Sequence, residues 1–289
     1  MKLIAIDMDG TLLNSQQTIS IQNKEAIQAA ISQGIKVVIA TGRAHFDAQT
    51  FLEEAGLALP IIGANGATYH NQQGELELSV PIPNEKAFDI ISWLHDEEYY
   101  YEIFTNQAIY TPHHGRNLLS IELDRLQSAN PSIKRDELET AALKQFNQTG
   151  YAFLSSFEDI KKKDAEIYNI LAFSFLKEKR DKGWDQFKDE NSLTLVSSGD
   201  HNFELEHHDA SKGNMLTYLA SQYNLPLEET MVIGDSFNDL SMMDAAGHSV
   251  AMGNARDEIK QKCTHVTLSN QEDGVAHIIS KTLEIEINK

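Results

Sequence analysis

Short apolar runs alternate with amphipathic stretches in the first part of the chain. Three runs are almost wholly apolar: residues 3–6, 35–40 and 61–62. Two stretches between them carry apolar side chains at helical spacing: residues 20–31 and 43–55. In the first of these we expect Ile27, Ala30 and Ile31 to share the buried face, and Gly34 and Gly56 to follow the helix ends. Strands without polar positions are covered on both faces, which predicts a parallel sheet flanked by helices.

The last third of the chain repeats this pattern. It predicts helices at residues 212–223 and 239–246, and buried strands at residues 230–233 and 249–252. Between the two parts, Pro81 and Pro83 mark a break, and a more polar and aromatic stretch begins. This stretch predicts strands that leave one face of their sheet wetter: residues 98–104, 107–111, 166–175 and 193–197.

We therefore expect an α/β protein with two domains. Residues 1–82 and 210–289 would form a core with a parallel sheet, and residues 83–209 an inserted α+β domain. Polar clusters follow three of the predicted core strands: residues 7–11, 41–43 and 234–239. Ligands of open parallel sheets bind outside the carboxyl ends of the strands, so these clusters are expected to converge on one site.

The residues of these clusters suit phosphate chemistry. Asp7 and Asp9 lie two positions apart where a strand ends, so their side chains can face a common ligand. One carboxylate can attack phosphorus or hold a cation, while the other donates a proton to a leaving oxygen. Asp235 adds an oxygen ligand suited to Mg²⁺. Thr41 can donate a hydroxyl hydrogen bond, and Lys212 can neutralise phosphoryl oxygens.

The motifs, taken in order, resemble those of the haloacid dehalogenase (HAD) superfamily. They are Asp7-Met8-Asp9-Gly10-Thr11-Leu12-Leu13, Thr41-Gly42-Arg43, Lys212-Gly213 and Gly234-Asp235-Ser236-Phe237-Asn238-Asp239. The long insertion and Asn65-Gly66-Ala67 resemble the Cof-like subfamily with its type IIB cap. The resemblance implies a Rossmann-like core with an inserted α+β cap domain of type C2B.

The resemblance also implies a role for each motif residue. Asp7 would be the nucleophile that forms an aspartyl-phosphate, and Asp9 the general acid and base. Mg²⁺ would be held by the Asp7 carboxylate, the backbone carbonyl of Asp9 and the side chain of Asp235, with Ser236 or Asp239 helping directly or through water. Phosphate would be bound by Thr41, the amides of Met8 and Gly42, Lys212 and Asn238.

The amino-acid composition limits the classes of binding partner that we expect. The 289 residues include 24 Lys and Arg against 43 Asp and Glu, a formal net charge of −19. Because binding to nucleic acids or anionic lipid depends on cationic side chains, we expect neither partner. The single cysteine, Cys263, excludes an intramolecular disulfide, and no stretch approaches the roughly 20 apolar residues of a membrane span. These features are typical of a cytoplasmic protein.

The sequence therefore predicts a Mg²⁺-dependent phosphatase of a small phosphorylated metabolite, either a sugar phosphate or a phosphorylated cofactor. A phosphotransferase or phosphomutase is the nearest alternative, but mutases of the superfamily usually have small helical caps. A phospho-receiver switch would carry its phosphorylated Asp on a middle strand rather than the first. A non-catalytic sugar-phosphate sensor would not need both Asp7 and Asp9.

Several further residues have two alternative interpretations. His113, His114 or Arg116, at an expected strand-to-helix turn of the insertion, would reach the substrate or lie on the surface. The adjacent pair His207 and His208 tempts a metal assignment, but neighbouring histidines usually point apart. Asn65 either contacts the leaving group or serves the turn before Gly66.

Overall fold

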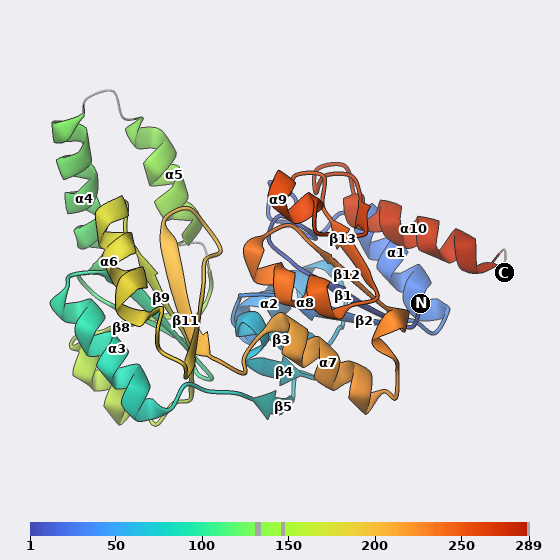
Figure 1. Cartoon of the computed structure of the whole chain (residues 1–289), viewed down its shortest axis with the longest axis horizontal. Helices are drawn as coiled ribbons and strands as arrows, with labels where there is room; N and C mark the ends of the chain where they lie inside the picture. Colours follow the sequence, from blue (N-terminus) through green and yellow to red (C-terminus); the bar gives the residue numbers. More distant parts are fainter. Residues whose placement is uncertain (131–133, 146–147, 288–289) are drawn as a thin grey trace. The chain divides into compact units, whose positions relative to one another are not determined.

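The chain forms two compact units in the computed structural model, which describes residues 1–130, 134–145 and 148–287. Unit 1 combines Met1–Ser79 with Asp209–Lys289, and unit 2 is Val80–His208 (Figure 1). The sequence pattern placed the two junctions after residues 82 and 209. The chain thus folds as an α/β unit interrupted by an α+β unit.

Unit 1 is built on one eight-stranded sheet. Its order is β14 (His265–Val266), β13 (His248–Ala251), β12 (Thr230–Gly234), β1 (Leu3–Ile6), β2 (Lys36–Ala40), β3 (Ile61–Gly63), β4 (Thr68–His70) and β5 (Leu76–Ser79). The strands from β14 to β3 run parallel, whereas β4 and β5 are antiparallel additions at one edge. The sequence did not predict this edge. Its connections are too short for a crossover helix, which favours antiparallel pairing.

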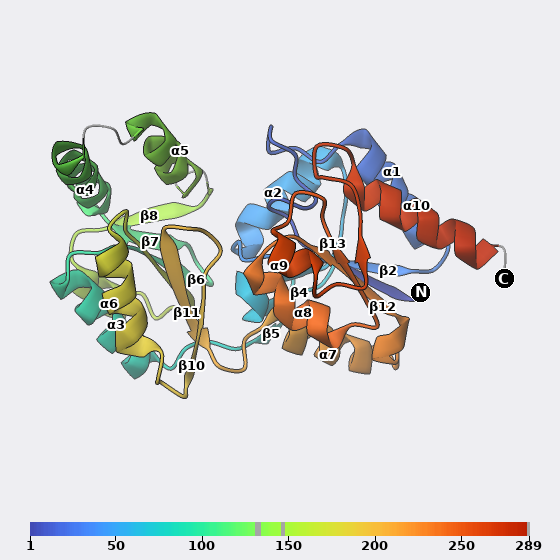
Figure 2. The same cartoon turned by 45° about the horizontal axis from the view of Figure 1, so that its top comes forward.

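Helices cover both faces of this sheet (Figures 1 and 2). On one face lie α1 (Ile21–Ser32), α2 (His45–Ala55) and α10 (Gly274–Ile287). On the other lie α7 (Lys212–Gln222), α8 (Leu240–Ala245) and the short α9 (Asp257–Lys260). Three 3-10 turns complete the unit: η1 (Ala64–Gly66), η3 (Leu227–Glu229) and η4 (Phe237–Asp239). Covered on both faces, the strands from β1 to β3 and β12 to β13 bury their apolar runs as the sequence pattern predicted.

The buried face of α1 differs from the predicted one at one position. Ala26, Ile27 and Ala30 are buried, but the Ile31 side chain is 44% exposed, so its predicted place in the core is wrong. The residue that completes the buried face of α1 is polar. Asn23 is buried, and its side-chain oxygen accepts a hydrogen bond of 2.9 Å from the Ala276 amide of α10. Apolar periodicity misses a polar residue that pairs across two helices.

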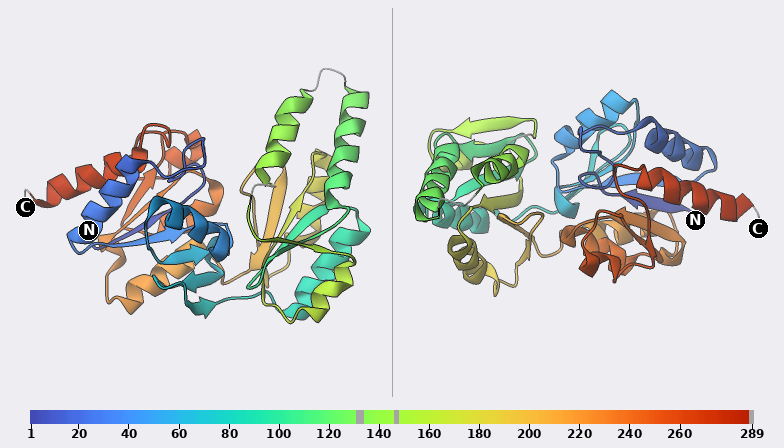
Figure 3. Two further views of the ribbon diagram at one scale, coloured as in Figure 1. Left: turned by 180° about the vertical axis from the view of Figure 1, so that it is seen from behind. Right: turned by 90° about the horizontal axis from the view of Figure 1, so that it is seen from above.

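Unit 2 contains a six-stranded sheet. Its order is β10 (Leu193–Val196), β11 (Asn202–His207), β9 (Ile167–Phe173), β6 (Tyr100–Thr105), β7 (Ile109–Pro112) and β8 (Tyr151–Leu154), antiparallel except for the last pair. Its helices are α3 (Asn84–Asp96), α4 (Gly115–Ala129), α5 (Arg135–Gln145), α6 (Lys177–Phe187) and the 3-10 turn η2 (Phe157–Lys162) (Figure 3). α3 and α6 pack on one face of the sheet. Among the described helices of both units, none combines the length and apolar composition needed to cross a bilayer.

The other face of this sheet is polar but buried, so the prediction of a wetter face is wrong. Glu102, Asn169, Glu204 and Glu206 are each at most 3% exposed. The hydroxyls of Tyr100 and Tyr151 donate to Glu102 at 2.5 and 2.7 Å. The Asn169 amide donates to Glu204 and Glu206 at 2.7 and 2.9 Å. A polar alternation in sequence does not separate a solvated face from a buried one whose polar groups largely bond to each other, although Asn169 Oδ1 has no hydrogen-bond partner among the described residues.

Two histidines of unit 1 form a stacked pair. His45 begins α2, His70 ends β4, and their ring centroids lie 3.7 Å apart at an interplanar angle of 11°. Among the described residues, Nε2 of His45 and Nδ1 of His70 are buried without a hydrogen-bond partner. Burial, and then the charge of His45, lowers the pKa of His70 to about 4, and burial also lowers the pKa of His45.

This pair predicts an acid-dependent loss of stability. An unfolded chain protonates histidine below about pH 6.5, whereas the folded protein keeps His70 neutral down to about pH 4. Stability from this source is therefore complete above pH 6.5 and falls as the pH is lowered toward 4. As the pH is lowered between these values, we expect the unfolding free energy of the His70→Gln variant to fall less than that of wild type. The difference is up to about the free energy contributed by one proton that the unfolded wild-type chain binds and the folded protein does not. Urea unfolding at several pH values measures how the unfolding free energy of each protein depends on pH. The same dependence in wild type and variant would contradict the prediction.

Candidate active site

The polar clusters of unit 1 lie at the carboxyl ends of neighbouring strands. β1 is paired on one side with β12 and on the other with β2, so their ends meet at the same edge of the sheet. Asp7 directly follows β1 and is 5% exposed, and Thr41 directly follows β2 and is 1% exposed. Asp235 directly follows β12. Strand order, rather than proximity in sequence, brings these residues together.

Lys212 joins these strand ends. It is the first residue of α7, after Ser211, whose side chain caps the helix by accepting from the Asn214 amide at 3.0 Å. The Lys212 side chain has no solvent exposure, and its ammonium donates to Asp7 Oδ1 at 2.8 Å and to Asp239 Oδ1 at 2.7 Å. A buried ammonium is stabilised only if carboxylates compensate for its lost hydration, and Asp7 and Asp239 do so here.

Two glycines allow α7 to approach closely enough for this contact. Gly66, at φ +102°, faces the Ser211 carbonyl oxygen, and a Cβ atom at Gly66 would lie 2.2 Å from it. A Cβ atom at Gly213 would lie 2.2 Å from the carbonyl oxygen of Ser241 in α8. Both obstacles are backbone atoms, which side-chain rotation does not relieve. The position of Lys212 thus depends on the absence of two side chains.

Three carboxylates gather around the ammonium. Asp7, Asp235 and Asp239 each offer an oxygen within 4.8 Å of the others. Asp239 is engaged on both sides, because its Oδ2 accepts from the amides of Asp235 and Ser236 at 2.9 and 3.0 Å. The hydroxyl of Thr11 donates to Asp235 Oδ1 at 3.2 Å. This arrangement supplies oxygen ligands suited to a hard divalent cation, with Asp239 ordering the loop that carries Asp235.

The electrostatics of the cluster also favour a cation. Burial, followed by the charge of Asp239, raises the pKa of Asp7 well above its usual value, although Lys212 opposes the shift. Burial and Asp239 raise the pKa of Asp235 to about 7. These shifts mean that one ammonium does not balance three crowded carboxylates. A divalent ion at this place would restore the balance, so the residues fit a metal ion.

The predicted phosphate-binding residues occupy the same edge. The Thr41 hydroxyl accepts from the Arg43 amide at 3.1 Å, and the Asn238 side chain donates to Asn65 Oδ1 at 3.0 Å. Asn65 is buried and adopts a left-handed conformation with φ +53° inside η1. Asn65 therefore serves the turn and also orients Asn238, a second task that the sequence did not indicate.

Arg43, like Thr11, is a residue of this site to which sequence reasoning gave no role. Asp9, with its side chain 49% exposed, accepts from Arg43 Nε at 2.6 Å and from Nη2 at 2.7 Å. In the described structure Asp9 therefore faces the guanidinium, whereas Asp7 faces Lys212. The recognised Thr41-Gly42-Arg43 motif contained the signal, since an arginine at a strand end beside carboxylates is suited to bidentate binding.

His113 and His114 of unit 2 lie where a turn was predicted. β7 ends at Pro112 and α4 begins at Gly115, which confirms a strand-to-helix turn there. His113 stacks on Phe153 with ring centroids 5.2 Å apart, and Arg116 lies 6.0 Å from the centroid of the Phe153 ring. Contact of His113, His114 or Arg116 with substrate stays a prediction.

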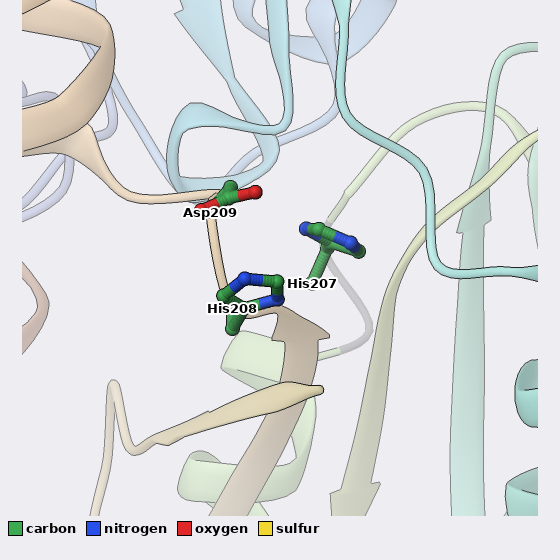
Figure 4. A group of neighbouring side chains, drawn as sticks. All are labelled: His207, His208 and Asp209. Atoms are coloured by element: carbon green, nitrogen blue, oxygen red, sulfur yellow. The ribbon is translucent and has the colours of Figure 1, made fainter. Parts of the chain in front are cut away.

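His207, His208 and Asp209 lie together at the junction of the units in the chain (Figure 4). Their ligand-capable atoms are within 4.8 Å of one another, and the two imidazole centroids are 4.5 Å apart. The expectation that neighbouring histidines point apart is therefore wrong here. β11 ends at His207, so the alternation of a strand does not extend to His208.

Comparison with known proteins places this site in a family. The family model described as haloacid dehalogenase-like hydrolase matches residues 4–279. The phosphatase YwpJ of Bacillus subtilis is 52% identical over 98% of this chain and 100% of its own length. The 5-amino-6-(5-phospho-D-ribitylamino)uracil phosphatase YwtE of the same organism is 41% identical, over 98% of both chains. A solved haloacid dehalogenase-like hydrolase from B. subtilis superposes with a TM-score of 0.86, at 51% identity, over 97% of this chain and 99% of its own.

The carboxylate and lysine cluster lies at the strand ends of a Rossmann-like core that an α+β unit interrupts in the chain, and the relatives that match this chain are named as hydrolases and phosphatases. Together these findings indicate a hydrolase that acts on phosphate esters. The chain belongs to the haloacid dehalogenase-like hydrolases, as the resemblance of its motifs indicated. Within that family it is a phosphoric monoester hydrolase.

The close approach at Gly213 predicts an unusual substitution effect. Glycine to alanine inside a helix normally stabilises a protein slightly. We expect Gly213→Ala instead to destabilise the fold by about 1–3 kcal/mol, because the new methyl group meets the Ser241 carbonyl. It should also lower turnover by displacing Lys212. Ser221→Ala, at an exposed position of the same helix, is the matched control. Thermal unfolding and phosphate release measure both effects, and a stabilised, fully active Gly213→Ala enzyme would refute the packing argument.

Proposed function

We propose that this enzyme is a Mg²⁺-dependent phosphatase of a small phosphorylated metabolite and that it works through an aspartyl-phosphate on Asp7. The observation that carries the proposal is the buried contact between the Lys212 ammonium and Asp7, beside Asp235 and Asp239. A carboxylate is a poor nucleophile toward a phosphate dianion unless nearby positive charge offsets the repulsion. The arrangement provides such charge from Lys212.

The proposed substrate is a sugar phosphate or a phosphorylated cofactor or cofactor precursor. Support comes from YwtE, whose name gives a phosphorylated ribitylamino-uracil as its substrate, and which matches this chain over 98% of both chains. A phosphate on a polar, hydroxylated leaving group is common to these candidates. The inserted unit 2 is the natural source of contacts to the leaving group, because the phosphate-handling residues all belong to unit 1.

In the first proposed step, an oxygen of Asp7 attacks phosphorus, and the bond from phosphorus to the leaving oxygen breaks. Asp9 donates a proton to that oxygen, which departs as an alcohol. Thr41, the amides of Met8 and Gly42, Lys212 and Asn238 bind the phosphoryl oxygens and keep phosphorus in line with Asp7.

In the second step, Asp9 accepts a proton from water, and the resulting hydroxide attacks phosphorus. The bond from phosphorus to Asp7 breaks, which releases inorganic phosphate and restores the Asp7 carboxylate. Asp9 thus regains the proton that it lost in the first step. The active-site side chains return to their starting protonation after each turnover.

Mg²⁺ would be held by the Asp7 carboxylate, the Asp9 carbonyl and Asp235, with Ser236 or Asp239 acting directly or through water. When bound, the ion supplies positive charge that offsets the phosphate and the three crowded carboxylates.

Replacement of the nucleophile gives a direct test. We expect Asp7→Asn to abolish turnover, by a factor on the order of 10³ or more, because an amide oxygen does not form a stable phosphoester. The fold should persist, since Asn keeps the shape of the side chain and removes a carboxyl group whose pKa burial raises. Phosphate release and circular dichroism measure the two outcomes. A folded Asp7→Asn protein that retains activity would remove the assignment of the nucleophile.

The substrate and metal requirement can be tested together. Phosphate release is measured from p-nitrophenyl phosphate, hexose, pentose and triose phosphates, flavin mononucleotide and pyridoxal phosphate. We expect EDTA to stop release, Mg²⁺ to restore it, and Ca²⁺ to restore it poorly because of its looser coordination.

Metal-dependent release with a preference for one leaving group would support the proposal and identify the substrate class. Full activity in EDTA would overturn the metal assignment. A folded, Mg²⁺-binding protein that released no phosphate from any ester would favour a transferase or a sensor.

A further inference from the structure

Arg43 has a more elaborate environment than a phosphate-binding arginine requires. Its guanidinium donates twice to Asp9, at 2.6 and 2.7 Å, once to Gln17 Oε1 at 3.0 Å and once to Asp47 Oδ2 at 2.6 Å. Its carbon Cζ also lies 4.6 Å from the centroid of the Phe51 ring. Four of the five N–H groups of a guanidinium are therefore engaged by these three side chains. Arg43 is 8% exposed, so these contacts form within the protein.

Asp47 is a buried carboxylate that contacts the other end of the Arg43 guanidinium. It lies in the first turn of α2, four positions after Arg43, and its side chain has no solvent exposure. Burial of a carboxylate is costly, and a cationic partner is needed to offset that cost. Asp47 supplies no ligand to the cluster of Asp7, Asp235 and Asp239, so the phosphate and metal chemistry does not account for it. Its contact with Arg43 Nη1 does.

We propose that Arg43, anchored by Asp47, is a positioning residue that sets the place of the Asp9 carboxyl group. The inference rests on the acid and base role proposed for Asp9. The chain of contacts runs from Asp47 on α2, through the planar guanidinium, to both oxygens of Asp9 after β1. A guanidinium bound to two carboxylates has a fixed orientation, which a lysine ammonium does not provide.

This positioning matters because Asp9 is the more exposed of the two motif carboxyl groups. Its side chain is 49% exposed, against 6% for that of Asp7. A side chain with that much freedom occupies several rotamers unless a partner restricts it. The rate of proton transfer falls steeply when the donor is misplaced by about 1 Å, so a fixed Asp9 carboxyl group raises turnover.

The test compares substrates with good and poor leaving groups. Asp47→Asn removes the anchor and keeps its shape, and Arg43→Lys keeps the charge and removes the two-pronged contact. Each is assayed on p-nitrophenyl phosphate and on the alkyl phosphate that the wild-type enzyme hydrolyses fastest. An alkoxide needs a proton far more than p-nitrophenolate does. We expect kcat for the alkyl ester to fall at least about tenfold further than kcat for p-nitrophenyl phosphate, a part of the roughly 10²- to 10⁴-fold effect of a positioned acid. KM should change little.

Controls separate this effect from general damage. Glu53→Gln, an exposed position on the same helix, should leave both rates unchanged. Phe51→Leu weakens the packing of the guanidinium without altering a charge, and it provides the same comparison should Asp47→Asn and Arg43→Lys fail to fold. Equal losses on both substrates in the folded variants would indicate a structural or phosphate-binding role and would overturn the inference.

Asp9→Asn and the double variant Asp9→Asn with Asp47→Asn tell the two proposals apart. Asp9→Asn alone should show the same selective loss on the alkyl ester, and adding Asp47→Asn should not increase it, since residues that act as a unit are not additive. No selective loss in Asp9→Asn would refute the acid and base role itself. A selective loss there, but not in Asp47→Asn or Arg43→Lys, would refute only the positioning role. An additive double variant would likewise show that Asp47 acts elsewhere.

Discussion

The active site depends on one buried ammonium group. Lys212 contributes the positive charge that lets Asp7 and Asp239 lie close together away from water. Without it, two buried carboxylates would repel each other, and one would take up a proton. The rest of unit 1 can be read as the means of placing this ammonium: a serine cap starts α7, and glycines on η1 and α7 remove the side chains that would hold the helix away.

The same constraint explains why the site favours a cation. One ammonium among three carboxylates leaves an excess of negative charge in a buried place, and the raised pKa values of Asp7 and Asp235 express that excess. A protein with a formal net charge of −19 has to attract an anionic substrate to such a site. A divalent cation bound beside Lys212 would supply the local positive charge that the site's own residues lack, and short-range contacts in a buried site outweigh a screened surface field.

The sequence predicted the elements that rest on regular patterns. Buried strands, helix ends and the order of the motifs could be predicted because each leaves a periodic or local signal. The orientation of Ile31 and the buried polar face around Glu102 could not be predicted, because they depend on partners distant in sequence. The antiparallel edge at β4 could not be predicted either, because strands of three and four residues are too short to leave a periodic signal. The site divided in the same way. Lys212 and the aspartates were indicated by their motifs. The contact of the Arg43 guanidinium with both oxygens of Asp9 was not, because it depends on side-chain rotamers and on a buried Asp47 that no motif contains.

The pairing of β1 with β12 also affects how the chain acquires its fold. Residues 3–6 leave a ribosome long before residues 230–234, yet these two segments form neighbouring strands. During synthesis the strand that carries Asp7 therefore has an open edge until most of the polypeptide has been made, and such edges promote association between chains. Folding of the sheet that bears the active site is then completed late, and the negative net charge of the chain, which repels other copies, is an advantage in that interval.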